Sequence, residues 1–244
     1  MRLDRDEYLA AVQADGARVR ELCAGRLDQP VPSCPGWLVR DAVLHLGFVH
    51  RINGSRLRRH SRSRDDRDTP TAPDDANLCA WFAEGVEQLL EVAHGLGPDT
   101  PIWNWSGTDP TAAFWFRRMA HETVVHRWDV EAALDGISPI ARNLAEDGID
   151  EFFEVFWTRN RDSFNGDGEW IHIRTLQGGQ DWWVGALPEG ADIRREAPLT
   201  AATTTIGAPP PELFLALWRR LPPEVLQIEG DQQLAARFLA APQL

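Results

Sequence analysis

Apolar residues recur at every third or fourth position along the first two-thirds of the chain, which is the periodicity of helices that bury one face. A first helix runs through Tyr8 and Leu22 and is expected to end at Gly25, since glycine often follows a helix C-terminus. A second helix is expected to begin near Trp37 and to carry Ile52 on its apolar face, and further helices are expected over about 75–94, about 111–134 and about 144–158. This succession of helices is typical of an up-down bundle.

The last part of the chain has a different pattern. The stretches EWIHIRTL and QDWWVGAL flank Gly178-Gly179 and predict a β-hairpin, and TAATTTIG and VLQIEG are typical of strands. The stretches PELFLALWRRL and QQLAARFLAA have helical periodicity. We therefore expect an α+β protein, with a helical domain over residues 1–160 and a smaller α+β domain over residues 161–244.

The helix expected over about 111–134 carries two polar residues, Glu122 and His126, in a stripe that is otherwise mostly apolar. Residues four positions apart lie one turn apart on the same helix face, so both side chains should point into the bundle. His45 lies on the apolar face of the helix that begins near Trp37. His121 points about 100° away from the stripe and is not counted with these three residues.

Two interpretations fit these three side chains. The first is a metal centre, because two histidines and one carboxylate with an open position form the ligand set of catalytic zinc or of ferrous iron. The second is a buried polar network in which the same side chains only hydrogen-bond one another. The spacing of the residues alone is compatible with both.

Composition narrows the class of protein. The formal charge of −12 argues against a nucleic-acid partner, which needs a basic surface, and the arginine cluster over residues 56–64 is interpreted as a solvated or mobile segment. No apolar run is long enough for a membrane span, and the N-terminus lacks a secretory signal, so we expect a cytoplasmic protein. The three cysteines indicate neither a disulfide framework nor a zinc–thiolate site. The eleven tryptophans fit either core packing or an aromatic ligand cleft.

Two blocks of sequence resemble a known family. The stretches VPSCPGWLVRDAVLHLG and WNWSGTDPTAAFWFRRMAHETVVHRWDVEAA are similar to the mycothiol-dependent maleylpyruvate isomerase family. The resemblance implies an N-terminal DinB-like four-helix bundle followed by a smaller C-terminal α+β domain. The two domains together cover nearly the whole chain.

The resemblance also implies a site. It assigns the metal ligands to His45, Glu122 and His126 and identifies the metal as zinc. The family's Leu-Trp-Gly-Arg-Leu run, which holds a functional arginine, corresponds to LWRRL here, so Arg220 takes the catalytic position and Arg219 replaces the glycine. Asp129 lies one turn beyond His126, and two roles fit this position: an acceptor of a hydrogen bond from that imidazole, or an ordinary aspartate on the helix surface.

The expected function follows from these residues. An open zinc position binds a thiol and converts it to a thiolate at neutral pH, and the resemblance identifies the thiol as mycothiol. The thiolate would add to a small electrophile, giving either S-transfer or cis–trans isomerisation of a maleylpyruvate-like acid. The alternative is a DinB-like protein that binds a metal or a small ligand without turnover. The electrophile and the oligomeric state are not indicated by the sequence.

Overall fold

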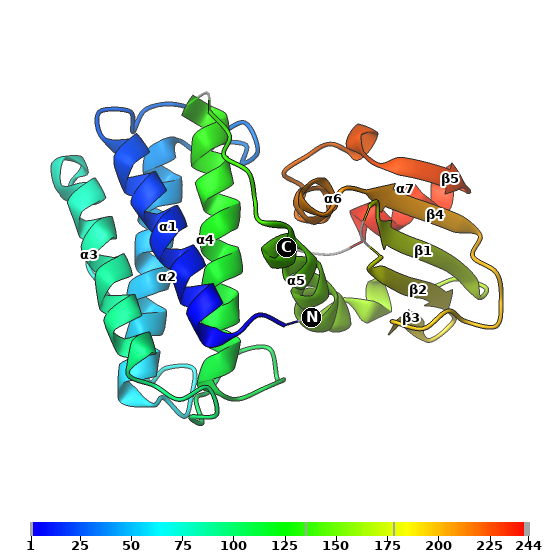
Figure 1. The fold of residues 1–244 in the computed structure, drawn as a ribbon, viewed down its shortest axis with the longest axis horizontal. Coiled ribbons are helices and arrows are strands. Elements are labelled where there is room, and N and C mark those ends of the chain that lie inside the picture. The colour runs from blue at the N-terminus through cyan, green and yellow to red at the C-terminus, as the bar shows by residue number, and fades with distance from the viewer. Residues whose placement is uncertain (1, 135, 178, 242–244) are drawn as a thin grey trace. The chain divides into compact units, whose positions relative to one another are not determined.

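The structure, a computed structural model, describes residues 2–134, 136–177 and 179–241. The chain forms two compact units, Arg2–Pro139 and a second unit that begins at Ile140 (Figure 1). Among the described residues, no helix combines the length and the apolar character that crossing a membrane requires.

The boundary between the units falls at Pro139 and not near residue 160, where the sequence pattern suggested it. The reason is the packing of helix α5 (Arg142–Glu151) on helix α6 (Pro210–Leu217) within the second unit. Gly148 of α5 faces the ring of Phe214, and any side chain at that glycine would overlap the ring. The fifth helix therefore belongs to the α+β unit.

The first unit is the expected four-helix bundle. Its described residues form α1 (Arg5–Cys23), α2 (Val39–Arg59), α3 (Asp75–His94) and α4 (Ala112–Leu134). Helix α1 starts at a capping box, in which the Asp4 carboxylate accepts from the backbone N–H of Glu7 and the Glu7 carboxylate accepts from that of Asp4. This local signal defines where α1 begins.

The direction of α3 differs from the expected up-down order. Gly47 of α2 faces Trp81 of α3, and Gly54 faces Leu89, so the two consecutive helices run in the same direction. The connecting segment 60–74 must therefore return along the length of a helix, which for 20 residues is about 30 Å. When extended, the segment 60–74 is long enough to cover this distance.

A disulfide joins two helices of the bundle, although the spacing of the cysteines did not indicate one. Cys23 at the end of α1 is bonded to Cys79 near the start of α3, and their Cα atoms lie 6.3 Å apart. The two cysteines are 56 residues apart in the sequence. Only the packing of α1 against α3 brings them together.

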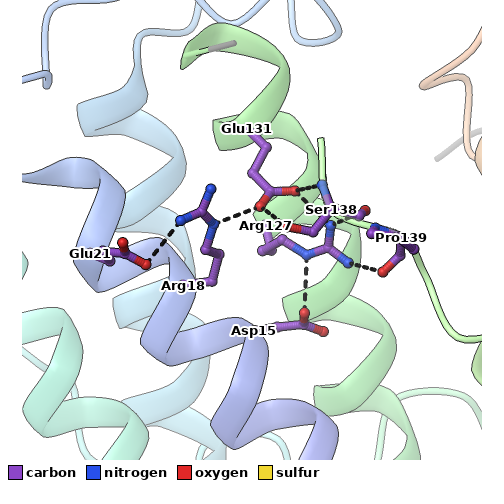
Figure 2. Close-up of polar contacts among 7 residues, drawn as sticks. All are labelled: Asp15, Arg18, Glu21, Arg127, Glu131, Ser138 and Pro139. Carbon is purple, nitrogen blue, oxygen red and sulfur yellow. Dashed lines mark hydrogen bonds and ion pairs between the residues drawn. The ribbon is translucent and has the colours of Figure 1, made fainter. Parts of the chain in front are cut away.

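A buried ionic network connects α1, α4 and the segment that follows α4 (Figure 2). The Glu131 carboxylate accepts hydrogen bonds from Arg127 Nη1 at 2.7 Å, Arg18 Nε at 2.9 Å and Ser138 N at 2.8 Å. Arg127 also donates to Asp15 at 3.0 Å. Burial alone would raise the pKa of Glu131, but the hydrogen bonds from Ser138, Arg18 and Arg127 outweigh it and lower that pKa to about 2.

The second unit is built on a five-stranded sheet in the order β3-β2-β1-β4-β5. Its strands are β1 (Glu169–Thr175), β2 (Asp181–Leu187), β3 (Gly190–Arg194), β4 (Thr204–Ala208) and β5 (Gln227–Gly230). Its remaining elements are α5, α6, α7 (Gln232–Ala240), the π-helical turn η1 (Phe152–Trp157) and the short 3-10 turns η2 (Arg161–Ser163) and η3 (Pro223–Val225). The α+β class is therefore confirmed.

The expected hairpin is present, since β1 and β2 pair antiparallel with Ile171 opposite Val184. Gly178, half of the predicted Gly-Gly turn, lies outside the described residues. Strand β3 was not predicted, because its sequence GADIR lacks a clear alternation of apolar residues. The helix expected over about 144–158 is shorter than predicted and continues as the π-helical turn η1.

Candidate metal centre

His45, Glu122 and His126 converge at one point inside the bundle. His45 Nε2 lies 2.8 Å from Glu122 Oε1, and His126 Nε2 lies 3.5 Å from the same oxygen. One ligand atom from each of the three side chains lies within 4.8 Å of the other two. The three residues that the sequence singled out are therefore adjacent in space.

The convergence has a local cause and a tertiary cause. Glu122 and His126 share a face of α4 because they are one helical turn apart. His45 reaches them from α2, which runs antiparallel to α4, as the pairs His45–Glu122 and Asn53–Met119 show. The helical pattern could predict the first relationship but not the second.

The two other buried histidines have different surroundings. His121 is fully buried with its ring 6.2 Å from that of Tyr8 on α1, away from the centre. His50 hydrogen-bonds the Thr123 hydroxyl at 2.9 Å, and burial lowers its pKa to about 4. His50 is therefore neutral near pH 7 and packs between helices. Leaving His121 out of the candidate ligands agrees with its position.

Glu122 is held by three partners. Its Oε2 accepts from Arg118 Nη2 at 2.9 Å, while its Oε1 faces the two imidazoles. Burial alone would raise the pKa of Glu122, but hydrogen bonds from His126 and His45 and the charge of Arg118 hold it well below the ordinary value. The carboxylate is therefore an anion that directs one oxygen to the histidines.

Asp129 orients His126, which is one of the two roles that its position one turn further along α4 allowed. His126 Nδ1 lies 2.8 Å from Asp129 Oδ2, and Asp129 is fully buried. When the His126 ring is neutral, an Nδ1–H that donates to this carboxylate leaves the Nε2 lone pair directed at the centre. The Asp129 carboxylate also accepts from Ser33 Oγ at 2.5 Å and from Cys34 Sγ at 3.6 Å, both in the turn before α2.

The centre is open on the side of His45. The exposed fraction of the side chain is 37% for His45 and 8% for His126. Trp37, at the end of the same turn, stacks on His126 with an interplanar angle of 14° and lies 5.4 Å from His45 between ring centroids. A depression of about 440 Å³ begins at His45 and Trp37. A small molecule could therefore approach the three side chains from one direction.

The donor set fits a zinc ion. Ligand atoms about 2.0–2.1 Å from a tetrahedral zinc lie roughly 3.3 Å from one another, and the observed separations reach 4.8 Å at most. Two neutral imidazole nitrogens and one carboxylate leave a fourth position for an exogenous ligand. The same contacts also satisfy a hydrogen-bonded polar network, so a measurement of metal content distinguishes the two interpretations.

Arg220 lies in the second unit, directly after α6. Its side chain is half-buried, and its Nη1 donates to the carbonyl of Trp218 at 2.9 Å. Arg219, which stands where the family has glycine, has a φ of 58°. The Arg220 N–H donates to the Leu215 carbonyl at 2.8 Å. This is the hydrogen bond of a helix end that usually has glycine at the position that Arg219 takes here.

The structure corrects the interpretation of the arginine cluster at Arg56, and it assigns two of the tryptophans to the core. Arg56 is not part of a solvated cluster, because it is 7% exposed and donates to Asn53 and to the carbonyl of Arg64. Burial, together with the nearby arginines, lowers its pKa to about 10. Trp115 and Trp182 are each 1% exposed and belong to the core.

Three residues of the centre were not identified from the sequence. Arg118 lies four residues before Glu122 and on the same helix face, so the helical pattern could have indicated it. Trp37 and Ser33 gave no comparable signal. Their place beside the histidines depends on how the turn before α2 folds against α4.

Comparisons with known proteins cover most of the chain. Residues 8–131 match the mycothiol maleylpyruvate isomerase N-terminal domain family, and residues 143–237 match the family of the corresponding C-terminal domain. No curated protein matches the chain.

Solved structures share the fold. A crystal structure described as the mycothiol-dependent maleylpyruvate isomerase superposes with a TM-score of 0.67 at 10% identity, covering 94% of this chain and 95% of that chain. A histidine-to-alanine mutant of that isomerase superposes with a TM-score of 0.66, at the same identity and coverage. With both of its parts matched in order, this chain belongs to the mycothiol maleylpyruvate isomerase family.

Proposed function

We propose that the protein is a zinc-dependent enzyme that activates a low-molecular-weight thiol, mycothiol, for addition to a small electrophile. The reaction is S-transfer or cis–trans isomerisation of a maleylpyruvate-like acid. The observation that carries the proposal is the convergence of His45, Glu122 and His126 on one point that is open on the His45 side. Membership of a family named for mycothiol and maleylpyruvate supports the choice of thiol and substrate class.

In this proposal the three converging side chains hold the metal. A zinc ion held by them would act as a Lewis acid and would lower the pKa of a bound thiol. Glu122 contributes one negative charge, and Arg118 holds the oxygen of that carboxylate that does not face the imidazoles. Asp129 holds the His126 imidazole with its Nε2 directed at the centre. The chain thus contributes three fixed ligand atoms for the metal and leaves the fourth coordination position open.

The outcome of the reaction depends on the fate of the adduct. A thiolate that adds to an unsaturated carbon converts the double bond to a single bond, which can rotate. Expulsion of the same thiolate then restores the double bond with the opposite geometry, whereas return of the proton that the thiol lost to the enolate carbon leaves a thioether. We assign to Arg220 the binding of a substrate carboxylate or of developing enolate charge, because guanidinium groups bind carboxylates in a bidentate fashion.

The partners follow from the same chemistry. They are a small acidic electrophile and a small thiol, and the formal charge of −12 disfavours nucleic acid. Low-molecular-weight thiols are kept reduced in the cytoplasm, so we propose a cytoplasmic location.

Metal content tests the proposal first. We expect about one equivalent of zinc in protein purified without chelators, and loss of that zinc in His126→Ala. His94→Ala removes an exposed histidine at the end of α3 and should leave the zinc content unchanged. Wild-type protein without any bound metal would support the polar-network interpretation instead.

Thiol dependence tests the second part. Zinc-loaded protein should convert a maleylpyruvate-like acid only when mycothiol is present. Arg220→Ala should raise KM for that acid and leave the zinc content unchanged. Tight binding of zinc and thiol without turnover of any acid would favour the non-catalytic binding protein.

A further inference from the structure

A second cavity lies between α2, α3 and part of the connecting segment 60–74. Its volume of about 150 Å³ is comparable to that of an engineered protein cavity that holds benzene. Among the described residues that line it, none is a candidate metal ligand or borders the depression at Trp37. His50 is fully buried and lies at the inner end, whereas Arg58 is exposed. The cavity is therefore a separate place for a small molecule and opens to solvent at one end.

At the inner end, the His50 imidazole presents an acceptor that has no donor. The Thr123 hydroxyl gives its one proton to the Met119 carbonyl at 2.6 Å, so it can only accept from His50. His50 Nε2 lies 2.9 Å from that hydroxyl and therefore carries the proton of the neutral ring. Nδ1 is left with a lone pair, and it is buried without a hydrogen-bond partner among the described residues. Such an acceptor is unfavourable unless a donor reaches it.

The remaining polar groups of the lining favour a ligand with a negative charge. The buried Nε–H of Arg51 has no acceptor among the described residues. In the part of the chain that the structure describes, the guanidinium of Arg58 makes neither a hydrogen bond nor an ion pair. Asp68 also borders the cavity, but Arg59 lies 3.5 Å from its carboxylate and compensates its charge. The open end is thus suited to an anion.

The spacing of these groups limits the shape of the ligand. His50, Gly54 and Arg58 follow one another at four-residue steps along α2 and all border the cavity. Residues at this spacing lie on successive turns of one side of a helix, and eight residues span about 12 Å along its axis. Gly54 has no side chain to fill the space between the two ends, and the long side chain of Arg58 bridges part of the distance. A ligand that reaches both ends is therefore short and rigid, with its donor and its charge at opposite ends.

We propose that this cavity binds a small organic carboxylate that has a hydroxyl group at the end opposite the carboxylate. The hydroxyl donates to His50 Nδ1, and its oxygen can accept from the Arg51 Nε–H. The carboxylate binds the guanidinium of Arg58. The site uses none of the three candidate metal ligands, so it does not depend on the proposed function.

A matched pair of ligands tests the buried acceptor. 4-Hydroxybenzoate and benzoate share the ring and the carboxylate and differ only in the hydroxyl. Titration calorimetry should give an affinity about tenfold higher for 4-hydroxybenzoate. In His50→Gln, the side-chain amide N–H can still donate to Thr123, while the acceptor at Nδ1 is lost. The two ligands should then bind with affinities within about twofold of each other.

Arg58→Gln tests the open end. It removes an exposed cation, so both ligands should weaken about three- to tenfold while 4-hydroxybenzoate keeps its advantage over benzoate. Arg62→Gln removes an exposed arginine of the connecting segment that does not line the cavity, and it should leave both affinities unchanged. His126→Ala removes a candidate metal ligand and should also leave them unchanged.

Four results would overturn the site. They are equal binding of the two ligands to the wild type, no binding of either ligand, a preference for 4-hydroxybenzoate that persists in His50→Gln, and loss of binding in His126→Ala. The last result would place the ligand at the metal centre instead. If His50→Gln does not fold, the comparison of Arg58→Gln with Arg62→Gln decides, because equal affinities in these two variants would also exclude the site.

Discussion

The hydroxyl of Ser33 donates a 2.5 Å hydrogen bond to Asp129, a residue 96 positions further along the chain. The same carboxylate lies 2.8 Å from His126 Nδ1, so the turn before α2 supports the group that orients a candidate metal ligand. Replacing Asp129 by asparagine removes the charged acceptor while nearly preserving its size. We expect the affinity for zinc to fall about 10- to 100-fold, measured by competition with a chromogenic chelator.

Ser33→Ala serves as the comparison for that variant. It removes one donor to Asp129 but leaves the carboxylate and its bond to His126, so zinc affinity should change by less than about threefold. Wild-type zinc affinity in Asp129→Asn would show that the carboxylate does not support the metal centre.

The ionic network around Glu131 predicts a pH dependence of stability. The pKa of Glu131 is lowered from 4.5 to about 2 in the folded protein (Figure 2). A carboxylate with a depressed folded pKa stabilises the fold fully above its unfolded pKa and loses this contribution as the pH falls through the folded value. Its contribution, on the order of 3 kcal/mol, should therefore be present above about pH 4.5 and lost by about pH 2.

Glu131→Gln tests this relationship by urea denaturation at several pH values. The difference in unfolding free energy between wild type and variant should be largest near neutral pH and shrink as the pH falls through that window. Glu21→Gln, whose exposed carboxylate bonds the same Arg18, should change stability by less than about 1 kcal/mol. A wild-type-minus-variant difference that does not vary with pH would contradict the assignment.

Arg219 adopts a left-handed backbone conformation with a φ of 58°. This conformation is unfavourable for any residue that has a Cβ atom, whereas glycine adopts it without strain. Arg219→Gly should therefore raise the free energy of unfolding by about 1 kcal/mol, measured by chemical denaturation. Arg219→Ala keeps the Cβ and loses the exposed hydrogen bond to the Ala240 carbonyl, so it should not stabilise. Equal stability of the glycine and alanine variants would exclude relief of backbone strain.

The bond between Cys23 and Cys79 predicts a defined thiol count. Unfolded protein kept free of reductant should expose one reactive thiol, that of Cys34, and reduction should expose three. Because the bond closes a loop of 56 residues, Cys79→Ser should lower the stability of the oxidised protein by about 4 kcal/mol. Cys34→Ser should leave stability nearly unchanged, and three reactive thiols without reductant would mean that the bond does not form.

Much of the local structure could be predicted because its causes are local. Helix α3 begins at Asp75 and ends at His94, as predicted, since Asp74 caps its first turn and Gly95 follows its last. The π-helical turn after Glu151 and strand β3 were missed. In both cases the apolar pattern of the sequence is compatible with more than one backbone geometry, and packing within the unit selects one of them.

By itself, the sequence determined the two-part α+β organisation, the helices of the bundle and the common face of Glu122 and His126, because hydrogen bonds between residues four apart impose the helical period. Only the tertiary structure decided that His45 lies level with Glu122, that Ser33 meets Asp129, and that α2 and α3 run in the same direction. These pairings depend on the path of the connecting segments and on side-chain packing between helices. Neither leaves a periodic signal in the sequence.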